Sequence, residues 1–266
     1  MESFLYSVNH LSFCYNRRAV ISDMSFAIAQ GEFIGVIGPN GAGKSTLIRL
    51  MAGFLHPEDG SIVFSGRNLS SYSRRELAAN IATLPQVTET PFSYTVEEFI
   101  LMGRYPHAQS GFFYHKGEED FVEYAIETME IPHLRGRRID TLSEGERQKV
   151  LLSQCIAQDP KALLLDEPVS HLDIRHQIQT FDVLDKLHKE GLTIIMVLHD
   201  LNLASEFCSR LMLISKGVLM SDGDPQTVLT FQNIEEAYDT VVIVRENPLS
   251  KKPFVVPVSK RYLRTR

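Results

Sequence analysis

The alternation of apolar and polar residues divides this chain into strand-rich ends and a helix-rich middle. Residues 4–13 and 20–28 show the approximate alternation of half-buried strands. Continuous apolar runs at residues 32–37, 162–165 and 193–198 are long enough for strands that are buried on both faces of a parallel sheet. The pattern therefore predicts an α/β fold.

Shorter patterns complete this prediction. Residues 81–84 resemble a strand, and residues 211–220 predict a hairpin that turns at Ser215-Lys216-Gly217. Phe13 to Arg18 is expected to form a turn that carries an aromatic residue. Helices are expected at residues 45–52, 74–80, 173–190 and 201–207.

Between residues 87 and 159 the strand patterns disappear and helical patterns dominate. Thr95 and Ser143 each precede acidic residues, as N-cap residues do, and Phe121 begins an apolar stripe at helical spacing. We therefore expect an α/β core interrupted by a helical insert and followed by a β-like tail. The expected boundaries are 1–86 and 160–240 for the core, 87–159 for the insert and 241–266 for the tail.

Residues 38–46 fit G-x-x-x-x-G-K-S/T, the pattern of the phosphate-binding P-loop. The motif lies between a predicted strand and a predicted helix, where glycines let successive N–H groups face an anion. Lys44 would add a charge for the β- and γ-phosphates, and the Ser45 hydroxyl could ligate Mg²⁺. A chance glycine-rich turn is the alternative, which the flanking elements disfavour. The loop consists of Gly38, Pro39, Asn40, Gly41, Ala42, Gly43, Lys44, Ser45 and Thr46.

Polar residues follow three of the predicted strands. Asp166 and Glu167 end a buried strand, where open parallel sheets bind their ligands. One acid could hold Mg²⁺ through its water shell, and the other could orient or deprotonate an attacking water. His199 could donate to a γ-phosphate, and Gln86 could lie near Mg²⁺ or water. The alternatives are a turn or capping role for the two acids, a surface or capping role for His199, and a simple turn at Gln86.

A second anion site is predicted at residues 142–148, which read L-S-E-G-E-R-Q. The Ser143 hydroxyl and the Gly145 amide lie at a predicted helix start, where N–H groups point at an anion. This helix is far along the chain from the P-loop. Two molecules packed head to tail could clamp each phosphate group between the P-loop of one copy and the Ser143 helix of the other.

Composition limits the remaining classes. The chain has 266 residues with 44% hydrophobic and 23% charged residues, which is typical of a globular protein. Its net charge of −6 does not favour a nucleic-acid surface. Three widely spaced cysteines indicate reduced thiols in the cytosol. We expect no signal peptide and no membrane span of roughly 18 apolar residues. Any membrane role would then be exerted from the cytosolic side through a partner.

Taken together, these motifs resemble those of the ATP-binding cassette (ABC) ATPases. The P-loop, L-P-Q at 84–86, the 142–148 stretch, L-L-L-D-E-P at 163–168, S-H-L-D at 170–173 and His199 occur in the order and at the spacing of that family. The resemblance covers nearly the whole chain. It implies a P-loop NTPase core with an antiparallel β subdomain and an inserted α-helical subdomain. It also implies ATP and Mg²⁺ as ligands, ATPase activity and a homodimer.

The resemblance gives a role to each matching residue on the nucleotide side. It implies that Tyr15 stacks on adenine, that Asp166 supports Mg²⁺ and that Glu167 is the general base. Phosphate and Mg²⁺ would be held by Lys44, Ser45 and Thr46.

It also gives roles to residues that face partners. Gln86 would link the Mg²⁺ site to the membrane partner, and His199 would be the switch histidine. Ser143 and Gly145 would contact the γ-phosphate bound by the opposite subunit, and Asp173 would lie at the dimer seam. The family usually reads L-S-G-G-Q where this chain has L-S-E-G-E, so we expect the side chain at position 144 to point outward.

Within that family, residues 95–107 and 247–253 resemble the ATPase subunits of importers for iron–siderophore complexes, haem or cobalamin. This implies a membrane permease and an extracytoplasmic binding protein as partners, and a peripheral location on the cytoplasmic face of the cell membrane. A soluble ABC ATPase without a permease and a P-loop kinase or GTPase are the alternatives. Phe92, Tyr94 and residues 112–114 could be core of the insert or a groove for a permease helix.

Overall fold

The computed structural model describes residues 4–86, 94–108, 117–170 and 172–263, which divide into two compact units. The first unit comprises the described residues up to Ser71 and from Ile195 onward, and the second comprises those from Tyr72 to Ile194. The expected limits of the helical insert, 87 and 159, stay predictions. Phe92 and residues 112–114 lie outside the described residues.

The first unit contains an antiparallel sheet with the strand order β2-β1-β4-β5. The Tyr6 ring packs 4.9 Å from that of Phe64, and the Tyr6 hydroxyl donates to the Met51 carbonyl at 3.3 Å. The ring contact lies within the sheet, and the hydrogen bond joins the sheet to helix α1. The elements involved are β1 (Phe4–Tyr15), β2 (Arg18–Ala29), β4 (Asp59–Phe64), β5 (Arg67–Asn68), the short helix η1 (Leu69–Ser71) and α1 (Lys44–Met51).

The turn between β1 and β2 is shorter than the sequence pattern suggests. Tyr15 pairs directly with Arg18, so the expected turn over Phe13 to Arg18 is wrong in extent. Only Asn16 and Arg17 turn the chain, with φ of 48° and 67°. Such left-handed pairs match the twist of a two-residue hairpin.

A second sheet of this unit follows the order β10-β9-β3-β8. Strands β3 and β9 are parallel, and β10 returns antiparallel to β9 through the expected hairpin. All five residues of β3 are buried, as its continuous apolar run predicts. The strands are β3 (Phe33–Ile37), β8 (Thr193–Val197), β9 (Arg210–Ser215) and β10 (Val218–Gly223).

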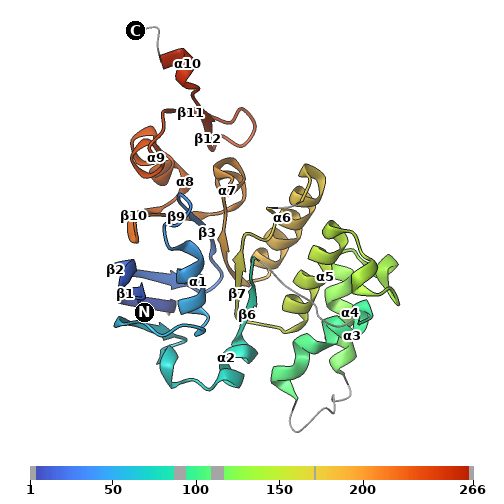
Figure 1. The fold of residues 1–266 in the computed structure, drawn as a ribbon. Helices are drawn as coiled ribbons and strands as arrows, with labels where there is room; N and C mark the ends of the chain where they lie inside the picture. Colours follow the sequence, from blue (N-terminus) through green and yellow to red (C-terminus); the bar gives the residue numbers. More distant parts are fainter. Residues whose placement is uncertain (1–3, 87–93, 109–116, 171, 264–266) are drawn as a thin grey trace. The chain divides into compact units, whose positions relative to one another are not determined.

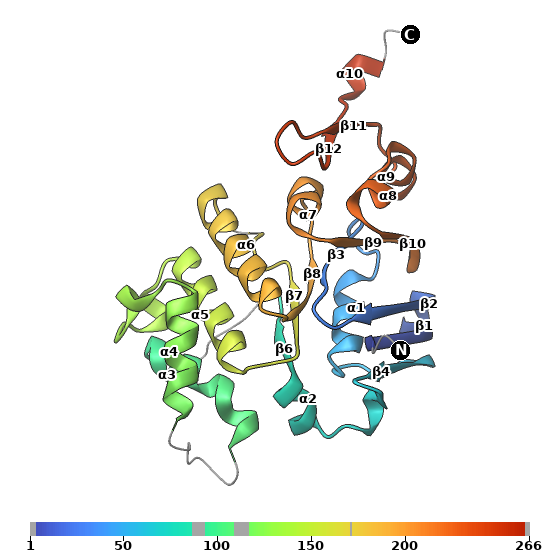
Figure 2. The same ribbon diagram turned by 180° about the vertical axis from the view of Figure 1, so that it is seen from behind.

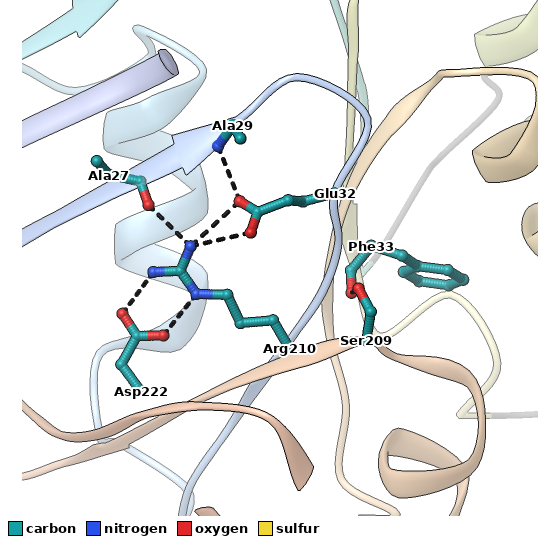
Figure 3. Close-up of polar contacts among 7 residues, drawn as sticks. All are labelled: Ala27, Ala29, Glu32, Phe33, Ser209, Arg210 and Asp222. Carbon is teal, nitrogen blue, oxygen red and sulfur yellow. Dashed lines mark hydrogen bonds and ion pairs between the residues drawn. The ribbon is translucent and has the colours of Figure 1, made fainter. Parts of the chain in front are cut away.

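An ion-pair cluster joins the two sheets of the first unit (Figure 3). The Arg210 guanidinium donates two hydrogen bonds of 2.7 Å to the Asp222 carboxylate. It also donates to the Ala27 carbonyl at 2.9 Å and to Glu32 at 3.1 Å. The Glu32 carboxylate in turn accepts from the Ala29 amide at 2.8 Å. Hydrogen bonds from Arg210 to Asp222 and then to Glu32 raise the pKa of the guanidinium.

We expect Arg210→Met to lower the free energy of unfolding by about 2 kcal/mol, because it removes several hydrogen bonds to charged groups and leaves Asp222 and Glu32 without their cation. Chemical denaturation would measure this loss. The matched control is Arg135→Met, since Arg135 pairs with Glu123 where both side chains are more than a third exposed. That variant should lose less than about 1 kcal/mol. Equal losses of unfolding free energy in the two variants would mean that the ion-pair cluster around Arg210 does not stabilise the fold more than an exposed pair does.

The C-terminal residues form a hairpin that packs on helix α7 (Figure 1). The Asn202 carboxamide pairs with the Val255 backbone, accepting from its amide at 2.7 Å and donating to its carbonyl at 3.2 Å. The Ser205 hydroxyl donates to the Pro253 carbonyl at 2.7 Å. The elements are α7 (Leu201–Phe207), α8 (Pro225–Val228), α9 (Phe231–Tyr238), β11 (Val242–Glu246), β12 (Pro253–Pro257) and α10 (Lys260–Leu263).

Asn202→Ala should lower the free energy of unfolding by about 1–3 kcal/mol, because it leaves a partly buried amide and carbonyl of Val255 without partners. Thermal or chemical unfolding would measure it. Asn9→Ala is the control, since Asn9 is exposed and its side-chain amide donates to Ser7 at 3.4 Å, a long hydrogen bond at the surface. It should change stability by less than about 0.5 kcal/mol. If Asn202→Ala loses no more stability than Asn9→Ala, the hairpin is not held by the pairing of Asn202 with Val255.

In the second unit β6 (Ile81–Leu84) runs parallel to β7 (Ala162–Asp166), and both are preceded by helices. Figure 2 shows α3, α4 and α5 side by side, and their contacts form the apolar centre of the helical part. The helices are α2 (Arg74–Asn80), α3 (Val96–Leu101), η2 (Met102–His107), α4 (Glu118–Thr128), η3 (Pro132–Leu134), η4 (Ile139–Thr141), α5 (Glu144–Ala157) and α6 (Ile174–Lys189).

Local sequence signals start three of these helices. Ser73, Thr95 and Ser143 are N-caps whose side chains accept from the amide three residues later, and a glutamate at that position closes each capping box. The expected N-caps at Thr95 and Ser143 are therefore confirmed. Among the described residues, we find no helix whose length and apolarity suit a bilayer crossing.

Candidate nucleotide-binding and catalytic site

The predicted P-loop connects β3 to α1 in the first unit. The amide of Ala42 donates to the Pro39 carbonyl at 3.2 Å, which curls the loop. The Gly217 amide of the β9–β10 turn donates to the Ala42 carbonyl at 3.2 Å and so fixes the loop to that turn. Asn40 and Gly41 are exposed at its tip. The loop therefore has a fixed base and an accessible rim.

Glycine is required at two positions of this loop for steric reasons. Gly38 has φ of 143°, and a Cβ atom there would lie 1.9 Å from the Ile214 carbonyl oxygen. Gly43 has φ of 106°, and its Cβ would lie 2.8 Å from the Val20 carbonyl oxygen. The backbone thus lies directly on neighbouring strands. This close approach lets its amides face outward together, which is what a phosphate nest needs.

Lys44 is the first residue of α1 and is 5% exposed. Its ammonium group donates to the Gly38 carbonyl at 2.7 Å and to the Pro39 carbonyl at 3.0 Å. The positive charge is thereby held over the first residues of the P-loop. The Ser45 hydroxyl and the buried Thr46 occupy the same first helical turn.

Two further predicted residues belong to this unit. Tyr15 ends β1 with 40% of its surface exposed, and its ring meets Phe13 edge-on at 4.8 Å. His199 is exposed two residues beyond the end of β8. The amide of the preceding residue, Leu198, donates to the Val36 carbonyl at 3.1 Å, which places the end of β8 beside the end of β3, from which the P-loop leaves.

In the second unit the ends of β6 and β7 bring Gln86 and Glu167 together. The two strands are parallel, so residues beyond Leu84 and Leu165 leave the sheet at the same edge. The Gln86 amide donates to the Glu167 Oε2 atom at 2.9 Å. Residues 81 positions apart in the sequence thus form one polar pair.

Glu167 has φ of 55°, in the left-handed region that few non-glycine residues adopt. Such a conformation costs about 1–3 kcal/mol and is concentrated at functional sites. The preceding Asp166 is 4% exposed at the end of β7. Carboxylate and carboxamide oxygens are donors that suit Mg²⁺, so Asp166 and Gln86 of this unit fit the ion by their chemistry.

The helix that carries Ser143 begins as expected, although its sequence departs from the family pattern. Glu144 is the first residue of α5, so its backbone is helical and the position does not need glycine. Glu144 is also exposed, as expected. Gly145 packs on α6, where an added Cβ would lie 3.3 Å from the His176 ring. Asp173 caps α6, accepting from the His176 amide at 2.9 Å and from its Nδ1 atom at 2.8 Å. Mainly the backbone hydrogen bond lowers the pKa of Asp173.

The predicted site residues are thus divided between the two units. Tyr15, the P-loop and His199 lie in the first, whereas Gln86, Ser143, Gly145, Asp166, Glu167 and Asp173 lie in the second.

Sequence reasoning missed three polar contacts of the second unit. The Gln148 amide of α5 donates to the Pro168 carbonyl at 2.7 Å, and Glu146 binds both Ser143 and Arg137. The S-x-x-E spacing of residues 143–146 signals the contact between Glu146 and Ser143. No local pattern signals Arg137.

Comparison with known proteins shows the family and the fold of this chain. The family model described as ABC transporter matches residues 21–170. The ferric enterobactin transport ATP-binding protein FepC of Escherichia coli is 36% identical over 94% of this chain and 93% of its own length. The hemin import ATP-binding protein HmuV of Rhodopseudomonas palustris is 39% identical over 90% of this chain and 91% of its own.

A solved structure gives the same result. A chain of an inward-facing ABC transporter, described as of metal-chelate type, superposes with a TM-score of 0.85 and 27% identity, covering 98% of this chain and 99% of its own. The P-loop NTPase fold expected from the motifs is confirmed by this likeness. This chain belongs to the family of ABC transporter ATP-binding proteins and is an ATPase of that family.

Proposed function

We propose that this chain is the ATP-hydrolysing subunit of a membrane importer for a metal chelate, that is an iron–siderophore complex, haem or cobalamin. The Gln86–Glu167 hydrogen bond supports the hydrolytic part, because it joins the carboxylate of a residue with a left-handed backbone to a carboxamide at a sheet edge. Relatives named for ferric enterobactin, hemin and cobalamin support the cargo class. All three align with at least 90% of this chain.

The residues divide the reaction between them. Lys44 and the amides of the P-loop bind the β- and γ-phosphates, and Tyr15 stacks on the adenine. Glu167 accepts a proton from the attacking water, and His199 donates to the γ-phosphate as charge develops there. Ser45, Asp166 and Gln86 would hold Mg²⁺, which when bound neutralises phosphate charge.

The working form is a homodimer in this proposal. Ser143 and Gly145 of one copy meet the γ-phosphate held by the other copy, and Asp173 lies at the seam. The exposed N-terminus of α5 supports this assignment, because its first N–H groups can receive an anion. The dimer works at the cytoplasmic face of the membrane, bound to permease subunits that receive cargo from an extracytoplasmic binding protein.

Two experiments test the proposal. Purification of the chain from membranes should recover a polytopic permease, and a strain that lacks the gene should lose uptake of one labelled iron chelate, haem or cobalamin. The wild-type gene should restore uptake, and the Glu167→Gln gene should not. If the chain hydrolyses ATP but no membrane protein co-purifies with it, it would instead be a soluble ABC ATPase.

A further inference from the structure

The N-cap residue of α5 is held by a carboxylate of its own helix. The Glu146 Oε2 atom accepts hydrogen bonds from the amide and from the hydroxyl of Ser143, each 2.8 Å long. A serine hydroxyl has a single proton. While Ser143 donates that proton to Glu146, it cannot donate it to another acceptor.

The same carboxylate also binds a guanidinium group from the loop before the helix. Arg137 Nη1 donates to the Glu146 Oε1 atom at 2.8 Å, and Nη2 donates to the Thr141 carbonyl at 3.1 Å. Hydrogen bonds from Ser143 and then from Arg137 lower the pKa of Glu146. Glu146 is therefore ionised at neutral pH, and its charge is matched by that of Arg137.

The start of α3 fixes the backbone that carries Arg137. The Val96 amide donates to the Arg137 carbonyl at 3.0 Å. The neighbouring Gly136 amide donates to both carboxylate oxygens of Glu97, at 3.0 and 2.9 Å. Arg137 thus reaches Glu146 from a loop that is bonded to the first turn of another helix.

We propose that Arg137 is a positioning residue for ATP, which neutralises Glu146 so that Ser143 can receive the terminal phosphate of ATP held by a second copy of this chain. This inference rests on the proposed function, because it takes Ser143 as a phosphate ligand. A phosphate oxygen that accepts the Ser143 proton replaces the Glu146 Oε2 atom. The displaced carboxylate keeps Arg137 as its partner. Without Arg137 it is an uncompensated negative charge beside an anion.

The test measures ATP-driven dimerisation of the full chain in a Glu167→Gln background, by analytical ultracentrifugation over a range of ATP concentrations. Arg137→Gln should raise the ATP concentration for half-maximal dimer formation about tenfold, the size expected for one unit charge at contact distance in water. The matched control is Arg138→Gln, since that side chain is 60% exposed and lies 3.7 Å from Asp140. The control should shift the midpoint by less than about twofold.

A second pair of variants distinguishes two roles of Arg137, which are neutralising the Glu146 charge and holding the Thr141 backbone. Glu146→Gln should lower the midpoint, and adding Arg137→Gln to it should change the midpoint by less than about twofold, because no carboxylate is left to compensate. The effect of Arg137→Gln should also shrink at about 1 M salt, where exposed charges are screened within about 3 Å. An arginine that only braces Thr141 would give the same loss in both backgrounds and at both salt concentrations, which would overturn the inference.

Ser143→Ala distinguishes the failure of this inference from that of the proposed function. It should prevent ATP-driven dimerisation in the same background. If Ser143→Ala dimerises normally, or if the Glu167→Gln chain never dimerises with ATP, the proposed composite site is wrong and the role of Arg137 is wrong with it. If Ser143→Ala fails while Arg137→Gln behaves like Arg138→Gln, the proposed function stands and only the role of Arg137 is refuted.

Discussion

Glu167→Gln is expected to lower the rate of ATP hydrolysis by about 10²- to 10⁴-fold, the usual contribution of a general base, while ATP binding persists. The substituted carboxamide has the same shape, and its oxygen can still accept from Gln86, which lies 2.9 Å from Oε2 in the native pair. What the variant loses is the ability to take a proton from water. The backbone at position 167, with φ of 55°, is unaffected by this change.

Phosphate release and binding of labelled ATP would measure the two effects separately. With hydrolysis blocked, ATP should accumulate in a dimer that gel filtration or ultracentrifugation detects. The control is Glu127→Gln, an exposed carboxylate on α4 of the same unit, which should hydrolyse ATP at the wild-type rate. Normal turnover by Glu167→Gln would mean that another group accepts the proton.

Much of the fold was predictable because its signals are local. The continuous apolar runs of β3, β7 and β8 have all their residues buried, as runs of this kind require in a parallel sheet. The Ser143 N-cap was equally predictable from the residues that follow it. Gln86 and Glu167 could each be found as polar residues beyond a strand end, whereas their pairing depends on β6 and β7 being neighbours in the sheet.

Contacts between residues distant in the sequence could not be predicted in the same way. Arg210 meets Ala27 across 183 positions, and no pattern near either residue indicates the other. The Asn16-Arg17 turn was misjudged because left-handed conformations at non-glycine residues are set by strand register rather than by composition. The contact of Arg137 with Glu146 was not predicted for a related reason, since the distance between them depends on where α3 holds the loop that carries Arg137.

The second large effect is expected at the base of the P-loop. Gly38→Ala should lower the free energy of unfolding by about 3 kcal/mol or more, because it combines a left-handed backbone with overpacking. Its Cβ would lie 1.9 Å from the Ile214 carbonyl oxygen, which belongs to β9 and cannot rotate away as a side chain could. To relieve that contact the loop must lift from the sheet, and the amides that face the phosphates then lose their common direction. We therefore expect ATP affinity to fall by more than about 100-fold, as the nest contributes several charge-assisted hydrogen bonds.

Gly41→Ala is the matched control, because it isolates the backbone effect from the steric effect. Gly41 also has positive φ, 77°, but an added Cβ would meet no atom of the described residues within 4 Å. Only the left-handed conformation is then penalised, at about 1–2 kcal/mol. Chemical denaturation without nucleotide gives both stabilities, and calorimetric titration with ATP gives the affinity of the Gly38 variant. Two equal losses of stability would show that backbone conformation alone demands glycine in this loop, and that β9 does not limit how the P-loop lies.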